Sequence, residues 1–136
     1  MNREQAYELL TQNLTTQNLI NHSLAVEAVM RRLARHFNED EELWGLAGLL
    51  HDIDYDNTKD DPEKHSLMGA EMLAEQGLSD GLVYAVKVHN EIHGLPRESL
   101  LDKALYATDP LTGLIVAGAL IRPEKKLGAV KVKSLL

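Results

Sequence analysis

Apolar residues recur along this chain at intervals of three and four, the spacing that places side chains on one face of an α-helix. Residues 16–37 show it most clearly, with Leu19, Val26, Val29 and Leu33 on one face. His22 falls on that same face. Strand-like alternation is confined to residues 129–132, a segment too short to decide anything. The pattern therefore predicts an all-α protein in which His22 points toward the core.

Capping residues and helix breakers give the ends of the other predicted helices. Prolines and glycines carry most of this signal: Pro62 suits a first helical turn, and Gly77 suits the residue after a helix. Six helices are predicted, over residues 2–12, 16–37, 38–52, 63–76, from Ser79 to the break at 94–96, and from Ser99 to about Ile121, before Pro123. Residues 53–63 are predicted to be an acidic turn. We expect a single-domain bundle of five to seven helices spanning residues 1–136.

The third predicted helix ends in two adjacent side chains that can both bind a metal ion, His51 and Asp52. Consecutive helical residues point about 100° apart, so both can reach one ion only where the backbone leaves the helix. The end of an apolar helix is such a place. Neutral imidazole and carboxylate suit Zn, Fe, Mn or Ni better than Ca.

Composition restricts the classes of function. The chain has 136 residues and a net charge of −7, and no continuous basic stretch could neutralise the phosphates of nucleic acid or an anionic membrane. With no cysteine it can form neither disulfides nor thiolate metal sites, which fits a reducing cytoplasm. No leader opens the chain, and the longest apolar run, residues 113–121, is too short to span a bilayer. We expect a cytoplasmic protein whose partner is a small molecule.

Six ionisable side chains lie on or beside apolar stripes or near helix ends: His22, His51, Asp52, His65, His89 and Asp109. Burying them together costs free energy unless a shared partner compensates their polarity, and a divalent cation is such a partner. Each also has a simpler explanation. His22 could be a core histidine, His65 a first-turn residue, His89 a residue stabilised by a helix dipole, and Asp109 a kink residue before Pro110.

The order of these residues resembles the H…HD…D signature of the HD-domain phosphohydrolase superfamily, over residues 18–115. The segments Lys64–Ala70 and Val88–Glu91 are similar to further histidine segments in members that carry two metal ions. The resemblance implies an HD-like bundle with one ion held by His22, His51, Asp52 and Asp109. It also implies that Asp52 bridges to a second ion held by His65 and His89.

The chain also departs from well-known members of that superfamily. Many read H-D-I-G-K, whereas residues 51–55 read His-Asp-Ile-Asp-Tyr, and Lys59 is a candidate to replace the missing cation. Residues 94–97, Gly-Leu-Pro-Arg, stand where cyclic-dinucleotide phosphodiesterases carry G-Y-P, which argues against cyclic-di-GMP as substrate. No long insertion that would build a triphosphohydrolase site is found.

Other side chains receive less specific predictions. His93 could protonate a leaving group or be a surface histidine, Asn90 and Glu91 could orient the ligating imidazoles, and Tyr55 could stack on a nucleobase. Asp54 and Asp56 are interpreted as solvated loop acids, although either could bind a metal or cap a helix. Trp44 and Tyr84 are expected in the core. Four basic side chains could contact phosphate or could simply be solvated at the surface: Arg97, Arg122, Lys125 and Lys126.

The resemblance implies a metal-dependent phosphohydrolase acting on a small phosphate ester, with a nucleotide as the first candidate substrate, while the residues themselves indicate a helical core that could hold a metal. One or two divalent ions (Fe, Mn, Zn, Ni, Co or Mg) would lower the pKa of bound water to about 7 and supply hydroxide. Asp52 and Asp109, with His93, are the predicted catalytic residues. Two alternatives stay open: a metal- or nucleotide-binding regulatory module without turnover, and a di-iron enzyme that uses oxygen. A homodimer is a further possibility.

Overall fold

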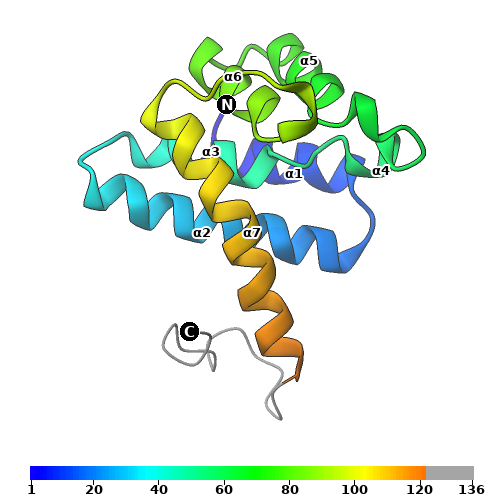
Figure 1. Cartoon of the computed structure of the whole chain (residues 1–136), viewed down its shortest axis with the longest axis horizontal. Helices are drawn as coiled ribbons and strands as arrows, with labels where there is room; N and C mark the ends of the chain where they lie inside the picture. The colour runs from blue at the N-terminus through cyan, green and yellow to red at the C-terminus, as the bar shows by residue number, and fades with distance from the viewer. Residues whose placement is uncertain (122–136) are drawn as a thin grey trace.

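The computed structural model describes the backbone of residues 1–121 and the side chains of residues 1–111. The described chain is helical and without strands, as the hydrophobic pattern predicts. Figure 1 shows the helices stacked around a central one. The α-helices are α1 (Arg3–Asn13), α2 (Gln17–His36), α3 (Glu41–Leu50), α4 (Tyr55–Thr58), α5 (Leu67–Glu75), α6 (Asp80–Val88) and α7 (Leu100–Ile121), and the 3-10 turns are η1 (Pro62–Lys64) and η2 (Glu91–His93).

Helix α3 is the centre of the bundle and packs against α1, α2, α6 and α7. Every residue from Trp44 to Leu50 is buried, so this helix is apolar on all sides, as expected for a core helix. Its N-terminus is capped by Asp40, whose carboxylate accepts the backbone N–H of Leu43. Burial of α3 brings its C-terminal end, and with it His51 and Asp52, into the interior of the protein.

The crossing of α2 and α3 depends on a glycine. A Cβ atom built at Gly48 would lie 2.9 Å from the backbone oxygen of Val26 and 3.0 Å from the Cα of Glu27. These are backbone atoms, which cannot move aside without separating the two helices. Gly48 therefore sets the distance between α2 and α3, and so the distance between the side chains that each helix contributes to the interior.

We predict that Gly48→Ala destabilises the protein by about 1–3 kcal/mol, the typical cost of overpacking a core. Urea unfolding followed by circular dichroism measures this change. Gly81→Ala in α6 is the matched control, because a Cβ there would meet no atom within 4 Å. That variant should be neutral or more stable by about 0.5–1 kcal/mol. Equal unfolding midpoints for the two variants would contradict the close approach at Gly48.

The predicted extent of one helix is wrong. The sequence predicts a single helix over residues 63–76, but η1 ends at Lys64 and α5 begins only at Leu67. Between them Ser66 has a positive φ of 70°, which ends the first helical turn. The carboxylate of Asp54 accepts the backbone N–H groups of Ser66 and Gly69, and this contact holds the break in place. The preceding acidic turn also contains the single helical turn α4.

Helix α7 packs against α2, α3 and α6, and its C-terminal part extends beyond the other helices (Figure 1). It continues through Pro110, so Asp109 lies inside a helix and not at a turn. In the part of the chain that the structure describes, no helix is both long and apolar enough to cross a membrane. The predictions for Arg122, Pro123, Lys125, Lys126 and residues 129–132 fall outside the described residues.

Candidate metal centre

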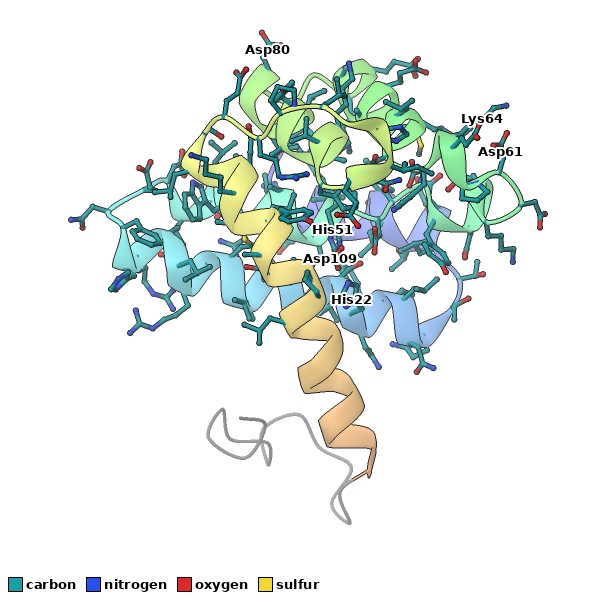
Figure 2. All side chains as sticks on the ribbon, in the orientation of Figure 1. His22, His51, Asp61, Lys64, Asp80 and Asp109 are labelled. Carbon is teal, nitrogen blue, oxygen red and sulfur yellow. The ribbon has the colours of Figure 1, made fainter. Side chains whose placement is uncertain are left out.

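Four of the predicted ligands come together between α2, α3 and α7. His22 comes from α2, His51 is the C-terminal cap of α3, Asp52 follows it, and Asp109 comes from α7. One potential ligand atom from each lies within 4.8 Å of the others. The Nε2 atom of His22 is 2.7 Å from Oδ1 of Asp109, and Nε2 of His51 is 3.2 Å from Oδ2 of Asp52. Figure 2 shows His22, His51 and Asp109 gathered where these helices meet.

A second group shares Asp52. Nε2 of His65 lies 3.2 Å and Nε2 of His89 lies 3.3 Å from Oδ1 of Asp52. The three residues again place their ligand atoms within 4.8 Å of one another. The two oxygens of Asp52 thus face different imidazoles, Oδ2 toward His51 and Oδ1 toward His65 and His89. Asp52 is therefore the residue that both groups would share if each held a cation.

The hydrogen bonds of the imidazoles test whether the group fits a cation. Nδ1 of His51 contacts the backbone oxygen of Gly48 at 2.7 Å, and Nδ1 of His89 contacts that of Val86. A carbonyl oxygen only accepts hydrogen bonds, so both Nδ1 atoms carry a proton, and the Nε2 atoms, which face Asp52, are the ones left to ligate a cation. Nε2 of His51 is buried and makes no hydrogen bond. A cation beside Asp52 would satisfy this atom, so the donor set fits a divalent metal.

In the protein without a bound cation, protons balance the two carboxylates. Burial lowers the pKa of His51, but the charges of Asp52 and Asp109 outweigh burial and hold it well above its usual value. Burial also lowers the pKa of His65, while contacts with Asp52 and Asp54 raise it to about 9. Burial raises the pKa of Asp52, and the opposing attraction of His51 holds it well below its usual range. The site therefore presents ionised carboxylates at neutral pH, and a binding cation must displace protons from the imidazoles.

The centre opens into a pocket of about 530 Å³. Glu91 and Tyr106 also line this pocket, where the hydroxyl of Tyr106 donates to Glu91 at 2.7 Å. The guanidinium of Arg97 lies 3.7 Å from the Tyr106 ring centre. The described lining residues of the pocket are His65, His89, Asn90, Glu91, Tyr106, Ala107, Asp109 and Pro110. The pocket is large enough for a small substrate to reach the side chains of the centre.

A second pocket of about 240 Å³ lies next to the first, with His65 and Asn90 in both linings. Its other walls include Tyr55, which is 41% exposed, and Lys59. Tyr55 and Lys59 thus lie near the centre, and their roles in stacking on a base and in replacing the missing cation stay predictions. The amide of Asn90 donates to the backbone oxygen of His65, so it steadies the segment that carries the ligand and not an imidazole ring.

The other predicted residues have mixed outcomes. Nε2 of His93 contacts the backbone oxygen of His65 at 2.7 Å, and its role as a proton donor stays a prediction. Trp44 is in the core at 2% exposure. Tyr84 is not: it is half-buried, and its hydroxyl donates to the backbone oxygen of Pro96. Asp56 accepts the backbone N–H of Thr15 and so ties its loop to the start of α2.

Asp54 is the functional candidate that the sequence did not reveal. The prediction of a solvated acid is wrong, because Asp54 is 0% exposed. Its Oδ1 lies 2.7 Å from Nδ1 of His65, and its Oδ2 accepts backbone N–H groups from Ser66 and Gly69. In an acidic loop without periodicity nothing distinguishes it from Asp56. Only the structure shows the close approach of Gly69, where a Cβ would lie 3.1 Å from the Asp54 carboxylate.

Comparisons with known proteins agree with the geometry. A ribonuclease Y from Oleidesulfovibrio alaskensis is 32% identical over 98 residues, covering 72% of this chain and 18% of its own length. An uncharacterized protein from Methanocaldococcus jannaschii is 33% identical over 116 residues, and the match covers 82% of this chain and 66% of that protein. The chain spans less than a fifth of the ribonuclease Y relatives, whose covered share is 16–19% in Mycoplasma genitalium and Lawsonia intracellularis.

The structural comparison gives the same family. A crystal structure from Clostridium acetobutylicum, described as a predicted HD superfamily hydrolase involved in NAD metabolism, matches with a TM-score of 0.63 and 27% identity. The match covers 80% of this chain and 68% of the other. The family model described as HD domain matches residues 19–117, which contain every residue of both candidate ligand sets. The chain belongs to the HD domain family.

Proposed function

We propose that the protein is a metal-dependent phosphohydrolase that acts on a small phosphate ester, with a nucleotide as the first candidate. The observation that carries the proposal is the buried, unbonded Nε2 of His51, which faces a carboxylate shared with two further imidazoles. Bringing these ionisable groups together in the interior is costly unless protons or a cation compensate them, and His65, His89 and Asp109 of the two groups line a pocket. Family membership and the neighbours described as hydrolase and ribonuclease support the same reaction class.

Each candidate residue would have a separate role in the reaction. Divalent ions held by the two ligand sets would lower the pKa of water to about 7 and offset charge on the phosphoryl oxygens. Asp52 would hold both ligand sets at a fixed spacing. Asp109 belongs to the first ligand set and also lines the pocket, so its ionised carboxylate can orient the attacking water. His93 would protonate the leaving oxygen after releasing the backbone oxygen of His65.

The two pockets support a nucleotide. The ring of Tyr55 is exposed enough to stack on a base, and Lys59 in the same lining offers a cation to a phosphate. Glu91 at the edge of the larger pocket can accept hydrogen bonds from sugar hydroxyls. The neighbour from Clostridium acetobutylicum is described as involved in NAD metabolism, which also points to a small nucleotide.

RNA is the second candidate substrate, because the ribonuclease Y relatives are 30–34% identical to this chain over the same domain. Two observations favour the small nucleotide. The net charge is −7, and none of the described residues lining the larger pocket is a lysine or arginine. A protein that holds a strand of RNA usually follows its backbone with a basic groove.

A phosphate-release screen tests the proposal. The purified protein is analysed for metal content and then incubated with nucleotides and short RNA oligomers, with Mn, Fe, Co or Ni added. We expect phosphate release from one or more nucleotides in a metal-dependent manner. Tight nucleotide binding without release would favour the regulatory module, and substrate-dependent oxygen consumption would favour the di-iron oxygen-using enzyme. Cleavage of RNA without phosphate release from any nucleotide would make RNA the favoured substrate.

A further inference from the structure

The imidazoles of the centre are oriented in two different ways. His51 and His89 cap α3 and α6, and the Nδ1 of each contacts the backbone oxygen three residues earlier in its own helix. His65 instead follows the short turn η1, and its backbone is extended, with ψ of 137°. Its Nδ1 contacts the carboxylate of Asp54, eleven residues earlier, at 2.7 Å. The orientation of His65 therefore depends on a side chain and not on a helix end.

We propose that Asp54 is the positioning residue that creates the second ion's ligand set, and that without its carboxylate the centre holds one ion. This inference rests on the metal centre of the proposed function. A carboxylate accepts hydrogen bonds and cannot donate, so it keeps the proton of His65 on Nδ1. Nε2 of His65, which lies 3.2 Å from an oxygen of Asp52, is then the ring nitrogen available to ligate a cation shared with Asp52.

The surroundings of Asp54 hold its carboxylate in one place. Its second oxygen accepts the backbone N–H groups of Ser66 at 2.7 Å and Gly69 at 2.8 Å. Its backbone oxygen accepts the hydroxyl of Thr58. The residue is 0% exposed, so water does not compete for these bonds. The chain from α4 to the start of α5 is thus folded around this one carboxylate.

A carboxylate partner also makes an imidazole a stronger ligand than a carbonyl partner does, because negative charge on the far side raises the basicity of Nε2. His51 and His89 have carbonyl partners, so His65 is the member of the second set whose ligand strength this chain has increased. Loss of an orienting partner of this kind typically lowers metal affinity by about 10–100-fold. The loss should fall on the second ion alone, since the first ligand set does not contain His65.

Asp54→Asn is the sharpest test, because asparagine has nearly the same shape. The two N–H groups of Ser66 and Gly69 require the amide oxygen on their side, which turns the amide NH₂ toward His65. Nδ1 of His65 must then accept, so its proton moves to Nε2 and faces Asp52. The variant should keep the first ion and bind the second about 10–100-fold more weakly.

Titration with Mn²⁺, followed by calorimetry and electron paramagnetic resonance, separates the two sites. The wild-type protein should bind two ions and give a spin-coupled signal, whereas Asp54→Asn should give the uncoupled signal of a single ion at the same Mn²⁺ concentration. Asp56→Asn is the matched control, because that neighbouring carboxylate contacts Thr15 and not the centre. It should behave as the wild type. His65→Ala should match Asp54→Asn, and the double variant should show no further loss.

The outcomes distinguish the two proposals. Failure of the wild-type protein to bind any ion would overturn the proposed function. Two coupled ions in both the wild type and Asp54→Asn would overturn the role of Asp54 alone. If Asp54→Asn does not fold, the wild-type protein loaded with Zn²⁺ decides by NMR. A slowly exchanging, downfield Nδ1 proton on His65 is expected, and its absence would refute the proposal.

Discussion

Asp52→Asn is expected to reduce phosphate release by about 10³-fold or more. Each carboxylate oxygen of Asp52 faces a different set of imidazoles, so one substitution disturbs both candidate ion sites. Cations at such sites contribute several kcal/mol of transition-state stabilisation, and each 1.36 kcal/mol corresponds to a factor of ten in rate. Asparagine nearly preserves the volume of the side chain, which limits effects on folding. The measurement is kcat with the substrate and metal that the screen identifies.

Asp61→Asn is the control for this variant. Asp61 is about half exposed and forms a salt bridge with Lys64 at 3.5 Å. It belongs to neither ligand set. It should retain wild-type activity. Circular dichroism of both variants shows whether they keep the helical fold. Wild-type activity in a folded Asp52→Asn protein would contradict the assignment of Asp52 as the shared ligand.

Removal of the metal is expected to lower the melting temperature by about 10–15 °C. A ligand that binds only the folded state stabilises it by about 4.1 kcal/mol at 1,000 times its Kd. For a domain of this size that stabilisation corresponds to roughly 10–15 °C. Thermal unfolding with chelator and with added Mn²⁺ measures the shift.

The same experiment with Asp52→Asn separates binding at the centre from binding elsewhere. This variant should lose most of the metal-dependent shift, because it lacks the carboxylate common to both ligand sets. Exposed acidic residues, of which the chain has many, would give a shift that Asp52→Asn does not change. An equal shift in the two proteins would therefore argue that the ion binds outside the proposed centre.

Sequence could predict the helices and the convergence of the ligand candidates for a physical reason. Residues on the apolar stripe of a helix point toward the same interior, so His22 on α2 and the end of α3 had to approach each other once the helices packed. For Asp109 the sequence left two interpretations, a ligand or a kink residue before Pro110, and the resemblance to a known family favoured the ligand. The structure continues α7 through this position and brings Asp109 to His22.

Contacts between loops could not be predicted in this way. Asp54 and Asp56 lie two residues apart in an acidic segment, yet one is buried beneath His65 and the other contacts Thr15 near the surface. Neither position belongs to a periodic pattern, so nothing local separates them. Asp54 also explains why the helix predicted over residues 63–76 is interrupted. Its carboxylate accepts the backbone N–H of Ser66 and so fixes the break before α5.

The central claim is that helices from distant parts of the chain enclose a divalent cation. A crystal structure of the Mn²⁺-loaded protein, with anomalous scattering recorded to locate manganese, tests it most directly. We expect one anomalous peak among His22, His51, Asp52 and Asp109, and a second about 3.5–4 Å away among Asp52, His65 and His89. Manganese bound only at surface carboxylates, with no peak beside Asp52, would contradict the account.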